Sequence, residues 1–277
     1  MFKSCSHQFI CHLPRVQPMK FNLTITFFLL SIIFSSCEQK NKYGKPVAEL
    51  ATVVKNIMSF LEYRDKNIRL YESFIGLDAA SNIISKDSFL KLLSTGSYLP
   101  LKMTSDDSTV YYKLYKLNDS VDPDITTTIR YWGLQEYDYY KLEGKEFPDY
   151  KFVDMDGNIY DKESTKGKIV VIKCWFLACL PCVKEMPVLN ELRQKYIAQK
   201  DVLFVSLCWD PKNKVNSFLK KNTFRYSTVP GQYKFLTESL ALNGYPTHFV
   251  LNRDGKIFKK TQDYREMIYA LKKLSLK

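Results

Sequence analysis

The chain has 277 residues with ordinary apolar and charged fractions, 45% and 25%, which excludes wholesale disorder and allows one or two folded domains. Its formal charge is +12, from 41 basic and 29 acidic residues. The lysines are scattered rather than gathered in one run, so this excess favours solvated surfaces over a nucleic-acid site. We therefore expect no nucleic-acid partner.

An export signal is the first feature along the chain. Residues 21–34 are mostly apolar and follow a lysine, and this stretch is shorter than the about 20 residues that span a bilayer. Two serines then precede Cys37, which is similar to a bacterial lipobox, whose cysteine is lipidated and becomes the mature N-terminus. We expect a lipoprotein-type signal peptide over residues 1–36, with Met19 as an alternative start. An ordinary secretory signal with a chance cysteine is the other interpretation.

A short polar, lipid-anchored tether is expected over residues 37–46, followed by a small α+β domain over residues 47–140. The patterns in this domain predict a helix over residues 47–71, a helix over 85–93 capped at Ser85 or Asp87, and strands over 109–117 and 125–132. The sequence of this region does not indicate what it does.

Strands and helices alternate after a boundary marked by Gly144 and Pro148. The patterns predict strands over residues 158–162, 166–176 and 201–209, helices over 180–198 and 212–221, a hairpin of strands 246–252 and 256–260, and a closing helix over 264–274. Strand–helix–strand alternation followed by an antiparallel pair predicts an α/β domain over residues 141–277, with a mixed central sheet and helices on both faces.

Two cysteines lie between a predicted buried strand and a predicted helix. Cys179 and Cys182 enclose Leu180 and Pro181, a spacing at which two thiols can close a disulfide across the first helical turn. The free amides and dipole of a helix N-terminus favour a thiolate, which lowers the pKa of the first cysteine below the usual value of about 8.5. We expect Cys179 to be the exposed nucleophile and Cys182 to resolve the mixed disulfide.

A zinc site and a structural staple are the alternatives for this pair. Zinc would need ligands from three separate regions, because His248 is the one histidine beyond the signal and no second Cys-x-x-Cys is present. A staple that closes so short a loop stabilises little, because the gain grows with loop length. We therefore expect redox chemistry, with no metal and no cofactor.

Residues 153–192 resemble the TlpA-like branch of the thioredoxin superfamily. Its members carry a strand, a tryptophan and then Cys-x-Pro-Cys-x-x-Glu-x-Pro, and this chain has Trp175, the Cys179–Cys182 motif, Glu185 and Pro187 in that order. The next strand and helix and the segment "GYPTHFVLNRDGKI" also match, so the resemblance covers about residues 143–277. It implies a thioredoxin-like fold and thiol–disulfide oxidoreductase activity.

The resemblance also implies roles for single residues. It implies a cis Tyr245–Pro246 bond in a loop that faces the dithiol, and Glu185 as a proton-exchange partner of Cys182, with a solvated glutamate as the alternative. His248 is then either a proton partner or a packed strand residue. The residues expected to contact substrate are Trp175, Leu180, Pro181, Tyr245 and Pro246.

The chain departs from the family at two positions. Thioredoxins have a buried acid where this chain has Lys173, which either stabilises a thiolate, acts as a base or extends to the surface. Ala178 stands where a tryptophan is common, which affects the expected potential and substrate surface. Cys174 and Cys208 end two strands that we expect to be neighbours. They are either inert buried thiols or a second disulfide or relay pair.

Together these features predict a lipid-anchored enzyme of the bacterial cell envelope that faces the periplasm. It would reduce disulfides in exported proteins, take electrons from an upstream thiol donor, and contact the membrane through the lipid on Cys37. A thiol peroxidase is one alternative, although the positions before Cys179 lack the Pro-x-x-x-Thr/Ser-x-x-Cys setting of peroxiredoxins. The other alternative is a binding lipoprotein in which residues 38–140 carry the main role.

Overall fold

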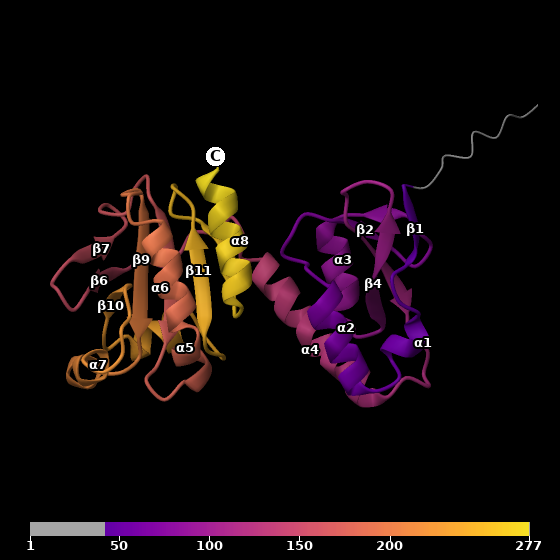
Figure 1. The fold of residues 1–277 in the computed structure, drawn as a ribbon, viewed down its shortest axis with the longest axis horizontal. Coiled ribbons are helices and arrows are strands. Elements are labelled where there is room, and N and C mark those ends of the chain that lie inside the picture. Colours follow the sequence, from indigo (N-terminus) through magenta and orange to yellow (C-terminus); the bar gives the residue numbers. More distant parts are fainter. Residues whose placement is uncertain (1–41, 277) are drawn as a thin grey trace, which may run out of the picture. The chain divides into compact units, whose positions relative to one another are not determined.

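The computed structural model describes residues 42–276, and Figure 1 follows them as a ribbon. Two five-stranded sheets, one in each half of the chain, are built upon separate cores, and we describe each half by itself. The expected signal peptide, the lipidation site Cys37 and the start of the tether lie outside the described residues. Within residues 42–276 no helix combines the length and apolar character needed to cross a membrane.

The first sheet has the strand order β1-β4-β5-β2-β3. Its strands are β1 (Tyr43–Pro46), β2 (Ile75–Leu77), β3 (Ile83–Ile84), β4 (Tyr98–Ser105) and β5 (Tyr111–Lys116). β1 pairs antiparallel with β4, so the last four residues of the expected tether form an edge strand instead. Pairing with β4 gives this backbone hydrogen-bond partners within the protein, which a free tether would have to find in water.

The helices of the first half are α1 (Leu50–Val53), α2 (Ile57–Asn67), α3 (Lys86–Leu93) and α4 (Pro123–Tyr140). The single helix expected over residues 47–71 is therefore two helices, because Asn56 interrupts it and caps α2 by accepting a hydrogen bond from the Ser59 backbone. The expected cap of α3 is confirmed: the Ser85 hydroxyl accepts from the Ser88 amide at 3.1 Å.

The strand predicted over residues 125–132 is wrong, because this segment lies inside α4. Its threonines and isoleucines favour strands locally, but the helix signals around them are stronger. Asp122 accepts a hydrogen bond from the Asp124 amide at the N-terminus, and Pro123 occupies the first turn. Ile125 and Ile129, one turn apart, are both fully buried, so tertiary packing decides the conformation.

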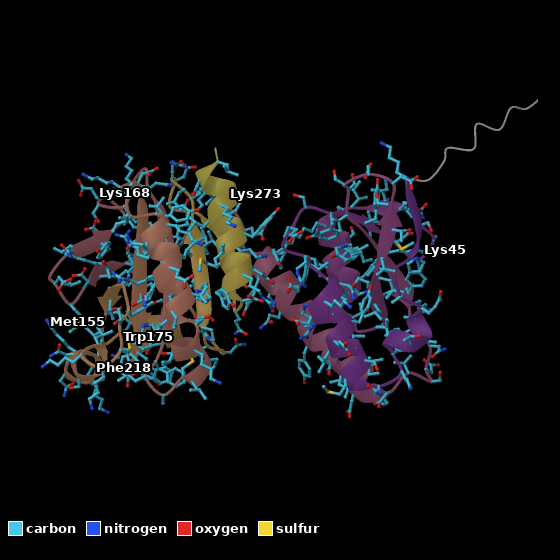
Figure 2. All side chains as sticks on the ribbon, in the orientation of Figure 1. Lys45, Met155, Lys168, Trp175, Phe218 and Lys273 are labelled. Carbon is cyan, nitrogen blue, oxygen red and sulfur yellow. A yellow bond between two sulfur atoms is a disulfide. The ribbon has the colours of Figure 1, made fainter. Side chains whose placement is uncertain are left out.

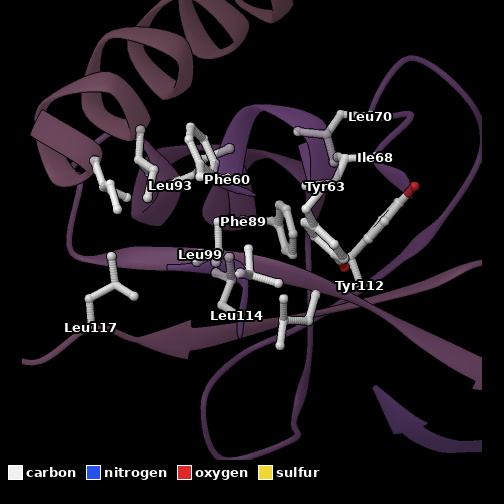
Figure 3. Close-up of a cluster of buried hydrophobic side chains, with 14 of the residues drawn as sticks. Phe60, Tyr63, Ile68, Leu70, Phe89, Leu93, Leu99, Tyr112, Leu114 and Leu117 are labelled. Carbon is white, nitrogen blue, oxygen red and sulfur yellow. The ribbon is translucent and has the colours of Figure 1, made fainter. Parts of the chain in front are cut away.

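Helices α2, α3 and α4 cover one core of the first half, which Figure 3 shows in close-up. The side chains labelled there are Phe60, Tyr63, Ile68, Leu70, Phe89, Leu93, Leu99, Tyr112, Leu114 and Leu117. A methyl group at Gly133 of α4 would lie 2.7 Å from the Leu93 carbonyl, so α3 and α4 approach each other as closely as they do because this residue is glycine.

The second sheet has the strand order β10-β9-β8-β11-β12. Its strands are β8 (Ile169–Trp175), β9 (Val202–Cys208), β10 (Ser227–Val229), β11 (Thr247–Leu251) and β12 (Ile257–Thr261), and β6 (Lys151–Val153) pairs with β7 (Ile159–Asp161) in a separate hairpin. β8, β9 and β10 are parallel, whereas β11 runs antiparallel to both β8 and β12. The expected mixed central sheet is confirmed.

The helices of the second half are α5 (Leu180–Lys184), α6 (Met186–Lys195), α7 (Lys212–Leu219), the π-helical turn η1 (Phe235–Ser239) and α8 (Tyr264–Ser275). The helix predicted over residues 180–198 is split at Glu185, because Pro187, in the first turn of the new helix, has no amide hydrogen to continue the old one. α6 and α8 pack on one face of the sheet, and Leu236 of η1 packs on the other, which confirms the α/β arrangement with helices on both faces.

β8 is the central strand of this sheet, and all seven of its residues are buried. It runs from beside Lys168 to Trp175, both labelled in Figure 2. Because side chains alternate along a strand, Lys173 and Trp175 share the face covered by α6 and α8, whereas Cys174 faces the opposite side. The chain leaves β8 at Trp175 and begins α5 at Leu180, after four intervening residues, which places the cysteine motif at the carboxyl edge of the sheet.

Candidate active site

The two cysteines of the motif form a disulfide at the start of α5. Cys179 is the residue that caps this helix, and its sulfur accepts the Cys182 amide at 3.3 Å. The two Cα atoms are 5.3 Å apart. We expected Cys179 to be exposed, but in this oxidised state its exposed fraction is only 4%. Phe176, Leu177 and Tyr245 pack around the disulfide and cover it.

An aspartate that sequence reasoning missed holds the loop before Cys179. The Asp210 carboxylate accepts the Leu177 amide at 2.8 Å, and the Cys179 amide in turn bonds to the Phe176 carbonyl at 3.1 Å. Asp210 lies two residues after the end of β9, as Leu177 lies two residues after the end of β8, and the ends of these adjacent parallel strands meet at one edge of the sheet. The place of Asp210 just after a predicted buried strand was the sequence feature that could have identified it.

Trp175 lies beneath the motif and does not reach the surface. Its side chain is fully buried against Phe218 and Phe224, with ring centroids 5.5 and 6.0 Å away. Figure 2 labels Trp175 and Phe218 next to each other. The expectation that Trp175 contacts substrate is therefore wrong, because the last residue of β8 faces the helix-covered side of the sheet. It supports the active-site loop from within the core.

The loop before β11 carries the expected cis bond between Tyr245 and Pro246. The Tyr245 ring contacts Phe176, at 5.4 Å between centroids, and Trp209, at 5.9 Å. Trp209 in turn packs against Tyr233 at 4.7 Å, and these two rings are 37% and 49% exposed. An aromatic surface of Phe176, Trp209, Tyr233 and Tyr245 thus adjoins the dithiol, of which the sequence predicted Tyr245 alone.

A groove of about 490 Å³ opens beside the motif. Its walls are formed by Pro181, Lys184, Glu185, Val188, Pro246 and residues 262–265. Pro181 and Pro246 thus line one cavity, and Leu180, the residue between Cys179 and Pro181, is 62% exposed. Of the five residues expected to contact substrate, Pro181 and Pro246 line this groove and Tyr245 packs against the dithiol, whereas Trp175 is buried beneath it.

A buried lysine lies directly behind the motif. Lys173 is fully buried, and its Nζ donates to the Cys182 carbonyl at 2.9 Å and forms an ion pair with Glu185 Oε1. The possibility that this lysine extends to the surface is thereby excluded. Glu185 is 7% exposed, so the alternative of a solvated helix glutamate is also wrong.

His248 completes this cluster from the neighbouring strand. It is fully buried and stands directly opposite Lys173 in the pairing of β11 with β8. Its Nε2 lies 3.1 Å from Glu185 Oε1, in a direction that departs from an ideal hydrogen bond. His248 is therefore both a packed strand residue and a neighbour of the carboxylate. Sequence alone could not choose between these interpretations.

The cluster is a neutral set of one cation, one anion and one uncharged imidazole. Burial alone would raise the pKa of Glu185, but its contacts with His248 and Lys173 outweigh this effect and hold that pKa below its usual value. Burial lowers the pKa of Lys173, against the opposing attraction of Glu185. Burial also lowers the pKa of His248, so its ring is uncharged at neutral pH.

The other two described cysteines, Cys174 and Cys208, are free and buried. They end neighbouring strands as predicted, but Cys174 is paired with Leu207 and Cys208 with Trp175, so the two thiols point to opposite faces of the sheet. A disulfide between them is excluded. Burial raises the pKa of both thiols, that of Cys208 to about 12, which makes them poor nucleophiles. Residues 42–276 contain no cluster of His, Cys, Asp or Glu suited to a metal ion.

Two thiols that open and close a disulfide at the start of a helix exchange electrons with the disulfides of other molecules. Together with the mixed sheet and the cis-proline loop, this chemistry places the protein in the class of thioredoxin-like thiol–disulfide oxidoreductases.

Comparison with known proteins agrees with this class. The Redoxin family matches residues 142–271. The chain is 31% identical over 118 residues to thiol-disulfide oxidoreductase ResA of a Bacillus cereus strain, covering 42% of this chain and 68% of the relative. It is 31% identical over 140 residues to ResA of Bacillus thuringiensis subsp. konkukian, covering 49% and 80%. The chain therefore belongs to the thiol–disulfide oxidoreductase family that includes ResA, within the TlpA-like branch.

A solved structure is also similar. The solution structure of a putative thiol-disulfide oxidoreductase from Bacteroides vulgatus is 30% identical, with a TM-score of 0.41, and the match covers 48% of this chain and 90% of that one. Each of these matches covers less than half of the present chain, and the Redoxin match lies within the half that carries the disulfide.

Proposed function

We propose that the protein reduces disulfide bonds in exported proteins, using Cys179 and Cys182 as its two-electron donor. The observation that carries this proposal is the Cys179–Cys182 disulfide at the N-terminus of α5, with the Cys182 amide directed at the Cys179 sulfur. The same amide and the helix dipole would stabilise a thiolate on Cys179 after reduction. Reduction rather than oxidation is the direction that the resemblance to TlpA-like proteins favours.

The reaction begins when the Cys179 thiolate attacks one sulfur of a substrate disulfide. A bond forms between Cys179 and that sulfur, and the other substrate sulfur leaves as a thiolate and takes a proton from solvent. Cys182 then gives its thiol proton to Glu185 and attacks the Cys179 sulfur, which closes the enzyme disulfide and releases the second substrate thiolate. Two electrons have passed from the enzyme dithiol to the substrate disulfide, and Glu185 returns its proton to solvent or to the departing thiolate.

Substrate would approach over the exposed residues beside the dithiol. Leu180 and Pro181 lie next to the sulfurs, and Tyr245 and Pro246 form the facing loop. We propose that the backbone before Pro246 pairs with the substrate chain and that the aromatic surface and the groove contact the residues around its disulfide. Such contacts are largely apolar, which suits partners of varied sequence.

The remaining parts of the proposal concern location and electron supply. The lipobox-like sequence ending at Cys37 supports a lipid anchor in the bacterial cell envelope, with the redox domain facing the periplasm. After each turnover the Cys179–Cys182 disulfide must be reduced again, so an upstream thiol donor is required.

The experiment that tests this function is a trapping assay. Cys182→Ser removes the resolving thiol, so mixed disulfides through Cys179 should accumulate and reveal the substrates by mass spectrometry. Cys179→Ser is the matched control, because it keeps Cys182 but should trap nothing. Failure of Cys182→Ser to trap any exported protein, together with failure of wild type to reduce insulin, would overturn the proposal.

A further inference from the structure

The buried cluster of Lys173, Glu185 and His248 contains more ionisable groups than the proposed reaction uses. Cys179, Cys182 and Glu185 already account for every bond and proton in that sequence. Lys173 and His248 lie fully buried on adjacent strands, directly opposite each other, and both approach the same oxygen of Glu185. Burying two such groups costs the free energy of their hydration, so we ask what they contribute to the site.

We propose that Lys173 and His248 are positioning residues that keep Glu185 ionised beside Cys182, and thereby set the pH at which the resolving thiol releases its proton. This inference rests on the proposed function and deepens it. Lys173 supplies the cation that pairs with Glu185, and His248 is the uncharged neighbour of the same oxygen.

The geometry separates the two oxygens of Glu185. Lys173 and His248 both approach Oε1, while no hydrogen bond from the described residues reaches Oε2. Oε2 is therefore the oxygen free to accept a proton. Lys173 also donates to the Cys182 carbonyl, so one ammonium group contacts both Glu185 and Cys182.

The charge balance explains why the carboxylate needs both partners. A carboxyl group as buried as Glu185 would hold its proton to a higher pH than usual, and a protonated carboxyl group cannot accept a proton from Cys182. The contacts with His248 and Lys173 reverse this tendency, so the pKa of Glu185 falls below its usual value. Removing the lysine would leave burial as the dominant influence, and the carboxyl group would bind a proton.

Other ionisable groups near the cluster do not replace Lys173. Tyr226, which precedes β10, is buried and its pKa is raised, so it carries no charge at neutral pH. Cys174 lies behind Lys173 and is also uncharged, because burial raises its pKa. The charged groups at the groove beside Glu185 are Lys184, Asp263 and Arg265. Asp263 and Arg265 pair with each other, and Lys184 is exposed, so solvent screens its field.

The test is a double-mutant cycle on the full chain, read out as the pH dependence of insulin reduction. Lys173→Met should move the pH of half-maximal rate upward by at least one unit, because Glu185 then keeps its proton to higher pH. Glu185→Gln and the double variant Lys173→Met/Glu185→Gln should share one profile, because the lysine acts through the carboxylate. Lys173→Arg, which keeps the cation, should restore part of the wild-type profile.

Several results would overturn the inference while leaving the proposed function intact. One is a Lys173→Met enzyme that is less stable but has the wild-type pH profile, which would make the lysine purely structural. Another is an equal Lys173→Met shift in the Glu185→Gln background, which would show that it acts without the carboxylate. If Lys173→Met does not fold, His248→Gln carries the test: a smaller upward shift supports the inference and an unchanged profile contradicts it. A wild-type enzyme that does not reduce insulin would instead contradict the proposed function.

Discussion

The two halves of this protein, each with a five-stranded sheet, differ in the kinds of side chain that they bury. Leaving tyrosines aside, every buried polar or charged side chain in residues 42–276 belongs to the second half of the chain. The first half buries leucines, isoleucines, phenylalanines and tyrosines beneath α2, α3 and α4. The second half buries lysines, a glutamate and a histidine among others, and three of these residues form the cluster behind the dithiol. The buried charged groups of the described residues thus lie in the half that carries the disulfide.

The two halves also differ in how completely their buried polar side-chain atoms are hydrogen-bonded. In the first half the Tyr63 hydroxyl accepts the Lys102 amide at 2.8 Å, and the Tyr112 hydroxyl bonds both Arg69 and Asn67. Within the described chain, the buried polar side-chain atoms without a hydrogen-bond partner are all in the second half, on Trp175, Tyr226, Tyr245 and His248. Unsatisfied buried groups reduce stability, so their concentration near one site is typical of a functional region.

The largest expected effect concerns the redox half. Cys179→Ser should reduce the rate of insulin reduction to background, because the hydroxyl cannot form the mixed disulfide, while the fold is retained. The measurement is turbidity of precipitating insulin with a thiol donor present. Cys174→Ala is the matched control, since it removes a thiol from the other face of the same sheet and should leave the rate unchanged. Residual activity in Cys179→Ser would assign the chemistry to another group.

The next prediction concerns the core of the first half. Phe89→Ala removes a fully buried ring and should lower the free energy of unfolding by about 3–5 kcal/mol. Urea unfolding followed by circular dichroism measures this loss. The rate of insulin reduction per folded molecule should not change. A slower rate in molecules that remain folded would mean that the first half takes part in the chemistry.

A smaller loss is expected where two helices meet. Gly133→Ala places a methyl group against the Leu93 carbonyl and should destabilise the protein by about 1–3 kcal/mol, although alanine favours helices. The same urea titration applies. A stabilised variant would show that α3 and α4 can separate without penalty.

The smallest effect concerns pH and the second half. The pKa of His248 is lowered in the folded protein, so as pH falls below about 6.5 the unfolded chain binds this proton first and stability declines, by up to about 1.4 kcal/mol per pH unit. His248→Gln should flatten this decline between about pH 6.5 and 5. Unfolding titrations at both pH values measure it. Equal slopes in wild type and variant would show that His248 is protonated in the fold.

Much of the redox half was predictable because its signals are local in sequence. The Cys179–Cys182 motif, the loop at Pro246 and the alternating strands each lie within a short segment. The buried cluster of Lys173, Glu185 and His248 could not be predicted, because it depends on the strand register that places His248 opposite Lys173, 75 positions away along the chain. Burial of Trp175 was missed for a similar reason: it depends on which face of β8 the helices cover.

The first half was harder to predict, because its elements are decided by packing. The segment 125–132 has a strand-like composition, yet the contacts of Ile125 and Ile129 place it in a helix. β1 is similar, since its four residues have the composition of a polar tether and become a strand because β4 provides a partner. Where local preference and tertiary contacts disagree, the sequence pattern alone misleads.

We propose that the start of α5 makes Cys179 a reactive thiolate. The most direct test of this claim is the rate at which iodoacetamide alkylates Cys179 in the reduced protein, followed by mass spectrometry as a function of pH. We predict half-maximal reactivity clearly below the pH of about 8.5 at which a free cysteine ionises. Half-maximal reactivity at or above that pH would contradict the account.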